Sequence, residues 1–172
     1  MELIPKHLGI PQLSNQSFIL NVLIDYFFEI DKLRVQFLSS EATLPKRSHD
    51  DDAGLDLYAC MDGCLSPGRV DHIATGLCLY LPKGTYGLVC SRSGHVVLSS
   101  IMIISGIIDS GYRGEIHIMA INLGKEDYHY RRGERIAQLV VQPYQKLHPV
   151  LDMYYDDKTT RSVFGLGSTG DF

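Results

Sequence analysis

The chain has 172 residues, which suits one domain, and 45% of them are hydrophobic while 21% are charged, proportions that exclude disordered and low-complexity classes. Its 16 basic residues are outnumbered by 20 acidic ones, for a formal net charge of −4, so stable nucleic-acid binding through a broad basic face is not expected. A small anionic ligand is compatible with this balance, because a few local basic groups are enough to hold it.

Residues 1–31 differ in texture from the rest of the chain: a polar, proline-interrupted start leads into a dense apolar run. Four polar positions interrupt that run, at Asn21, Asp25, Glu29 and Asp31. The run is therefore too short to span a bilayer, and the spacing predicts an amphipathic helix instead. We expect an N-terminal extension that packs on the body of the protein. No secretory signal is recognisable, which favours an intracellular protein, in the cytoplasm or nucleus, without membrane association.

From 32 to 155 the pattern changes to short apolar runs separated by turn residues, which predicts an all-β domain, a jelly-roll-like barrel or sandwich. The expected strands cover 33–38, 77–81, 86–90, 96–108, 116–123 and 136–141. The turn residues at 82–84 predict a hairpin between the second and third of these strands. Residues 156–172 are expected to form a C-terminal arm.

Four cysteines lie inside or beside the apolar runs, at Cys60, Cys64, Cys78 and Cys90. Cys60 and Cys64 are close in sequence, but no second pair and no nearby histidine at zinc-finger spacing completes a set of four ligands. We expect reduced thiols that are buried or without a chemical role.

Asp109 closes an apolar run and is followed by Tyr112 and Arg113 within the segment 106–115. Asp, Ser and Gly after a strand are also ordinary turn residues. The combination of a carboxylate, an aromatic ring and a basic group nevertheless favours a site, because a carboxylate can act as general base on water while a ring covers a sugar or base.

Arg92 stands between two serines and is followed by Gly94, a combination suited to an oxyanion because guanidinium groups bind phosphate in a forked geometry. The glycine- and hydroxyl-rich segment 161–170 is either a frayed end or a phosphate cradle. It lacks the lysine of a Walker loop.

Asp56 lies between two leucines in an expected strand, so its carboxylate requires a partner. The acidic run at 50–52 is interpreted as a solvated loop.

Five of these segments occur in one order along the chain: 53–57, 92–94, 106–114, 132–139 and 161–170. Together they resemble the five motifs of the trimeric dUTP pyrophosphatases, or dUTPases. The similarity extends from about residue 32 to residue 170, and its specificity comes from all five motifs lying in register along one domain.

The resemblance implies a jelly-roll homotrimer that converts dUTP and water to dUMP and pyrophosphate, with each active site at a subunit interface and closed by a neighbour's C-terminal arm. Asp109 would orient water for attack on the α-phosphorus, and Tyr112 would stack under the deoxyribose. The remaining implied substrate contacts are the backbone at Ile103, Gly106, Ile107 and His117 for uracil, Arg92, Ser93, Gly94 and Gln138 for phosphates, and Arg161, Leu166, Gly167 and Ser168 from the arm.

The family also implies Mg²⁺ held mainly by the triphosphate and water, which agrees with the reluctance of this ion to lose its hydration shell. No direct protein ligand is expected. Asp56 and Gln138 would lie near the ion through water.

The fifth motif departs from the family, which carries a phenylalanine that stacks on uracil where this chain has Leu166. Phe164 lies two residues earlier, so either side chain is a candidate to cover the base. Loss of an aromatic stack would remove about 1–3 kcal/mol of binding and predicts an active but weakened enzyme.

Two alternatives stay open. One is a non-catalytic or weakly active nucleotide-sensing or signalling module on the same scaffold. The other is a dCTP deaminase relative, against which Gly94 counts, because deaminases normally have a second serine there.

Overall fold

The computed structural model describes residues 32–93 and 99–152. The predicted extension over 1–31, residue 94 of the second motif and the predicted arm over 156–172 lie outside the described residues. Within the described ranges the chain forms strands β1 (Arg34–Phe37), β2 (Leu55–Tyr58), β3 (Gly63–Leu65), β4 (Val70–Ala74), β5 (Leu77–Tyr80), β6 (Thr85–Ser91), β7 (Ile101–Ile103), β8 (Ile107–Asp109), β9 (His117–Asn122), β10 (Tyr128–Tyr130) and β11 (Arg135–Pro143).

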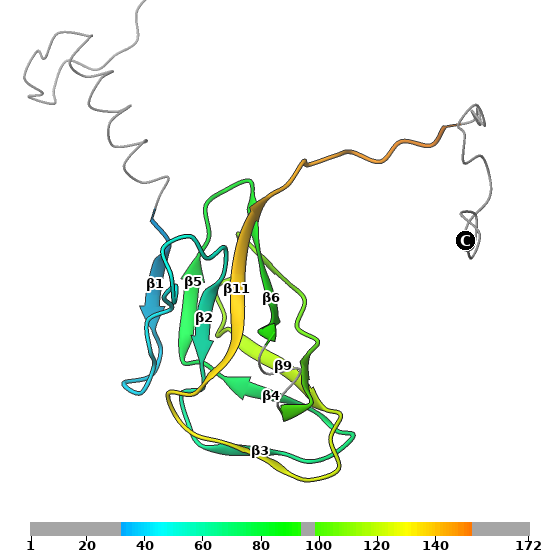
Figure 1. Ribbon diagram of the computed structural model, residues 1–172. Helices are drawn as coiled ribbons and strands as arrows, with labels where there is room; N and C mark the ends of the chain where they lie inside the picture. Colours follow the sequence, from blue (N-terminus) through cyan, green and yellow to red (C-terminus); the bar gives the residue numbers. More distant parts are fainter. Residues whose placement is uncertain (1–31, 94–98, 153–172) are drawn as a thin grey trace, which may run out of the picture.

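The named strands pair in antiparallel fashion in four sheets, which confirms the predicted all-β class. The larger sheets have the orders β2-β11-β6-β8 and β4-β9-β7, and β1-β5 and β10-β3 form two-stranded sheets (Figure 1). One hydrophobic core joins the two larger sheets, with Leu57, Val89 and Leu139 from one and Ile73 and Ile118 from the other.

Strand β9 shows how the sequence determines which side chains enter the core. Its buried residues, Ile118, Ala120 and Asn122, alternate with more exposed ones, as the two-residue period of a strand requires. The buried amide of Asn122 donates to the carbonyls of Leu65 and Glu126, each at 2.8 Å, and its oxygen accepts the Gly124 N–H at 2.8 Å. The polar side chain is therefore compensated inside the core.

The predicted hairpin between 77–81 and 86–90 is wrong. A turn does form at 82–84, with Gly84 at φ +81° and the Thr85 N–H donating to the Pro82 carbonyl at 3.2 Å. However, β5 pairs with β1, whereas β6 pairs with β11 and β8. The turn carries the chain from one sheet to another, because both flanking strands have an apolar face that the shared core buries.

The continuous strand expected over 96–108 is also interrupted. Residues 94–98 are not described, β7 joins the β4-β9-β7 sheet, and β8 pairs with β6 in the other large sheet. The chain therefore crosses from one large sheet to the other between β7 and β8 and crosses back between β8 and β9. An apolar run alone carries no signal for where a strand ends and the next sheet begins.

Strand β11 pairs with both β2 and β6 and then continues as an extended segment that leads away from the body (Figure 1). Along this segment the side chains of Leu147, Val150 and Leu151 are 78%, 85% and 89% exposed. Such a row of uncovered apolar side chains is typical of a surface that another chain covers. Across the part of the chain that the structure describes, no helix has the length and apolarity needed to cross a membrane.

Candidate active site

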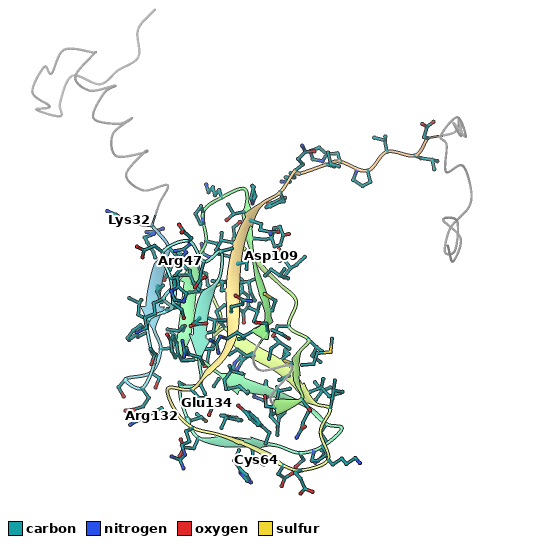
Figure 2. All side chains as sticks on the ribbon, in the orientation of Figure 1. Lys32, Arg47, Cys64, Asp109, Arg132 and Glu134 are labelled. Atoms are coloured by element: carbon teal, nitrogen blue, oxygen red, sulfur yellow. The ribbon has the colours of Figure 1, made fainter. Side chains whose placement is uncertain are left out.

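A pocket of about 260 Å³ opens where β8 ends and β9 begins. Asp109 is the last residue of β8, and the Tyr112 N–H donates to the Asp109 carbonyl at 3.0 Å, which turns the chain at once. The position of Asp109 on the body is labelled in Figure 2. The pocket is lined by Ile107, Ile108, Asp109, Tyr112, Glu115 and His117. Four site residues predicted from the sequence, at 107, 109, 112 and 117, therefore share one cavity.

The ring of Tyr112 is held at its far end although the side chain is 44% exposed. Its hydroxyl donates to the Glu115 carbonyl at 3.0 Å. Gly114 makes this possible, because a Cβ at that position would lie only 2.4 Å from the Tyr112 Oη. The ring is thus positioned before a ligand arrives, which lowers the entropic cost of binding.

Arg113 supports the loop and does not face the pocket. Its guanidinium donates to the carbonyls of Ser110 and Tyr112, at 2.8 and 2.6 Å, and stands 4.8 Å from the centre of the Tyr80 ring. These contacts fasten the turn after Asp109 to β5. The basic group in this motif therefore has a structural part in holding the loop.

Glu115 and His117 form one wall of the pocket, and His72 packs against it. His117 is predicted from the sequence, whereas Glu115 and His72 are not. Glu115 Oε1 accepts the Gly76 N–H at 2.7 Å, while Oε2 lies 3.6 Å from His117 Nε2. The His117 ring meets the ring of His72 edge to face, with centroids 5.1 Å apart. Glu115 directly follows the third motif, but only the pairing of β4 with β9 brings His72 to this wall.

A second polar cluster surrounds Asp56, which is only 7% exposed. Its Oδ1 lies 2.8 Å from Arg92 Nε, and its Oδ2 accepts from Ser48 Oγ at 3.0 Å and lies 3.4 Å from Arg135 Nη1. The partner expected for this carboxylate is thus present, and two cations flank it. Ser48 and Arg135 were not among the predicted site residues, although Arg135 lies inside the fourth motif.

Gln138 sits beside this cluster, opposite Asp56 in the β11–β2 pairing. Its Nε2 donates to the Ser91 carbonyl at 3.0 Å. Its Oε1 occupies the space beside Gly54, where a Cβ would lie at 2.2 Å. The glycine of the first motif therefore makes room for the glutamine of the fourth.

The other predicted residues are placed differently. Ile103 is 7% exposed and its N–H already donates to Ser91 Oγ at 2.9 Å, so that N–H is not available to uracil. Gly106 and Ser93 are exposed, and no described atom lies within 4 Å of a Cβ at Gly106. The predicted residues that lie outside the described ranges are Gly94, Arg161, Leu166, Gly167 and Ser168.

The pocket and the arginine cluster lie at opposite ends of β6. Asp109 pairs with Tyr86 near the start of β6, whereas Arg92 follows its last residue, Ser91. Arg92 lies six residues after Tyr86 along extended chain, a span of about 20 Å. One chain therefore does not bring the carboxylate of Asp109 and the guanidinium of Arg92 onto the same phosphate group.

The donors beside Arg92 fit a hydrated Mg²⁺ better than a directly bound one. The Asp56 carboxylate already receives Ser48 and two guanidinium groups, and the Gln138 amide is packed against Gly54. Mg²⁺ binds commonly through substrate phosphates while it keeps several waters. Asp56 and Gln138 would therefore lie near such an ion only through its waters.

Fold and site together define a class of protein. It is an antiparallel β sandwich that has a small pocket lined by a carboxylate, and a separate arginine cluster suited to phosphate. A family model described as dUTPase matches residues 40–170. The chain therefore belongs to the dUTPase family.

Relatives from bacteria agree with this assignment. Deoxyuridine 5'-triphosphate nucleotidohydrolase of Corynebacterium glutamicum is 41% identical over 145 residues, which cover 83% of this chain and 97% of the relative. The protein of the same name from Clostridium tetani is 36% identical over 140 residues, covering 80% and 96%.

Solved structures give the same fold, which confirms the predicted jelly roll. A mutant of the dUTPase of Staphylococcus bacteriophage 80alpha, in complex with dUpNHpp, superposes with a TM-score of 0.77 at 28% identity and covers 81% of this chain and 99% of its own. A mutant dUTPase from phage phi11 of S. aureus, described as coordinating a structural Mg(II) ion, has a TM-score of 0.69 at 26% identity, covering 73% and 99%. The 80alpha dUTPase is also described as controlling transfer of virulence genes.

Proposed function

We propose that this chain is a dUTP nucleotidohydrolase, which cleaves dUTP with water to dUMP and pyrophosphate. The observation that carries the proposal is that Asp109 lines one pocket together with Tyr112, whose ring is fixed by the hydrogen bond of its hydroxyl to the Glu115 carbonyl. The relatives that cover most of the chain are named for this activity.

The reaction needs a base, a positioned substrate and neutralised phosphates. Asp109 accepts a proton from a water molecule while the oxygen of that water attacks the α-phosphorus. Pyrophosphate leaves from the opposite side. Tyr112 packs against the deoxyribose, where its fixed ring leaves no space for a 2′-hydroxyl. The walls at Ile107 and His117, with the open backbone at Gly106, receive uracil.

The phosphate groups are assigned to Arg92, Ser93 and Gln138, joined by Gly94 and by Arg161 of the arm. Arg92 is suited to this task because Asp56 fixes its Nε through an ion pair of 2.8 Å. Asp56 and Gln138 would lie near a phosphate-bound Mg²⁺ through water, and the ion would supply charge neutralisation when bound. A covalent intermediate is not needed, since positioning and electrostatics provide the rate.

The active site is proposed to form between subunits of a homotrimer. Two observations support this: Asp109 and Arg92 lie at opposite ends of β6, and the segment after β11 exposes a row of apolar side chains. In such an assembly the pocket of one chain faces the arginine cluster of a second. The arm, with Leu166, Gly167 and Ser168, closes the site, and Leu166 or Phe164 covers the base.

A signalling role on the same scaffold is the second candidate, favoured by the similarity to the 80alpha dUTPase. It is distinguished by turnover, because a pure nucleotide sensor binds dUTP without cleaving it.

The experiment is pyrophosphate release with Mg²⁺ from dUTP, dCTP, dTTP and UTP, measured for the wild type and for Asp109→Asn. We expect turnover of dUTP alone, reduced at least about 100-fold by the substitution, with dUpNHpp still bound. Equal rates on all four nucleotides would contradict the assigned substrate. Tight dUTP binding with no turnover by the wild type would favour the sensor.

A further inference from the structure

A group of metal-ligating side chains lies outside the active site, on the two-stranded sheet of β3 and β10. Cys64 and His129 are direct cross-strand partners in this sheet, and Asp127 precedes β10 by one residue. One donor atom from each of the three side chains lies within 4.8 Å of the others. All three residues are exposed. Three different donor types, a sulfur, an imidazole nitrogen and a carboxylate oxygen, therefore converge on one exposed spot.

The register of the sheet explains why they converge. Residues directly opposite each other on an antiparallel pair have Cβ atoms about 5 Å apart and project to the same face. The thiol of Cys64 and the carboxylate of Asp127 each place a donor atom within 4.8 Å of the other. The cluster is thus set by the strand pairing and does not depend on a chance approach of distant loops.

We propose that Cys64, Asp127 and His129 form a binding site for one borderline divalent cation of the Zn²⁺ type, with water as the fourth ligand. Tetrahedral Zn²⁺ holds a sulfur and a nitrogen ligand about 3.5 Å apart, from bond lengths of about 2.3 and 2.0 Å. Side-chain rotations that move the donors by about 1 Å reach this geometry from the observed spacing, and exposed side chains allow them. Thiolate and imidazole favour Zn²⁺ over Mg²⁺, which prefers an all-oxygen shell.

Access and location agree with a site that is separate from catalysis. Cys64 also lines a second pocket, of about 300 Å³, whose other walls include Ser66, Arg69 and Asp71. Cys64 lies on the lower edge of the molecule, far from Asp109 (Figure 2). The bound ion would join β3 to β10 and stabilise the fold without touching the nucleotide.

Binding is tested on the full-length chain without a polyhistidine tag, with Co²⁺ as the spectroscopic probe and Zn²⁺ as its competitor. We expect one Co²⁺ per chain, a thiolate-to-metal charge-transfer band in the near ultraviolet, and loss of the band on adding one equivalent of Zn²⁺. Zn²⁺ should also raise the Tm of the wild type. Mutation of residues that only hydrogen-bond to metal ligands changes metal affinity about 10- to 100-fold. Loss of a ligand itself should cost at least as much, so Cys64→Ser and His129→Ala should each weaken binding at least 10-fold.

Matched controls are Cys90→Ser, Cys90 being a partly buried cysteine, and His148→Ala, His148 being an exposed histidine of the segment after β11. Both should keep the wild-type affinity and band. dUTP turnover in Mg²⁺ should be unchanged in Cys64→Ser, which shows that the variant is folded and separates this proposal from the proposed function. A wild type without the thiolate band, or a band that persists in Cys64→Ser, would overturn the site.

Discussion

At the scale of single residues, two glycines in one loop differ in the space that a side chain would have. A Cβ at Gly114 would lie 2.4 Å from the Tyr112 hydroxyl, whereas a Cβ at Gly111 would meet no described atom within 4 Å. Neither Gly111 nor Gly114 has a positive φ. The difference is therefore one of space around the Tyr112 ring and not of backbone conformation.

Gly114→Ala should displace the Tyr112 ring and lower kcat/KM for dUTP about 10- to 100-fold, because small misplacements of a positioning group are costly. Gly111→Ala is the control and should behave as the wild type. Steady-state kinetics of the two variants decide the point. Equal kcat/KM values would show that the ring does not position the substrate.

The Asp56 carboxylate anchors two cations, so its loss affects both stability and phosphate binding. Asp56→Ala leaves Ser48 without its acceptor and Arg92 without its ion pair. We expect about 1–3 kcal/mol less free energy of unfolding, together with a higher KM for dUTP. Asp71→Ala, which removes an exposed contact with His72, should change stability by less than about 0.5 kcal/mol. Denaturant unfolding and kinetics test this, and an unchanged KM in Asp56→Ala would contradict the anchoring of Arg92.

At the scale of elements, the turn between β10 and β11 is held by one carboxylate. Glu134 accepts the Tyr128 hydroxyl and, at 3.0 Å, the Arg131 N–H. Gly133 occupies the left-handed region at φ +78°, which glycine adopts without strain. Burial, and then the hydrogen bond and charge of Glu134, raise the pKa of Tyr128 above its ordinary value of 10.0.

Tyr128→Phe should lower the free energy of unfolding by about 1–3 kcal/mol at neutral pH, because it removes a hydrogen bond to a charged group. A raised pKa in the folded state means that the contribution of Tyr128 is complete below pH 10 and is lost as pH rises above it. The stability difference between the wild type and Tyr128→Phe should therefore shrink above pH 10. Tyr144→Phe, at an exposed position, is the control, and a difference independent of pH would contradict this account.

The same elements show what the sequence could predict and what it could not. Asp109 and Tyr112 could be predicted together because they lie close along the chain, around one turn, whereas Ile107 and His117 were implied only by the resemblance to the family. The contacts of Asp56 with Arg92 and Arg135 could not, because they depend on which strands pair and in what register. The wrong hairpin between β5 and β6 has the same cause: a turn signal locates a reversal but not the sheet that the next strand joins.

At the scale of the whole molecule, the separation of two half-sites is the main consequence of the fold. The carboxylate of Asp109 and the guanidinium of Arg92 are placed at opposite ends of β6. If both groups act in one site, as proposed, an isolated chain does not contain a complete site. The proposed closed, symmetric trimer would unite them, because the pocket of each subunit would then meet the arginine cluster of a neighbour.

Subunit complementation tests this claim most directly. Asp109→Asn and Arg92→Ala are each expected to be inactive, and the two are unfolded together, refolded as an equal mixture and assayed for pyrophosphate release from dUTP. If each site takes Asp109 from one chain and Arg92 from another, random mixing restores about a quarter of wild-type activity, since half of the chains supply each intact group. If both groups act from the same chain, no site in the mixture is complete and activity stays at the level of the parents, which would contradict the account.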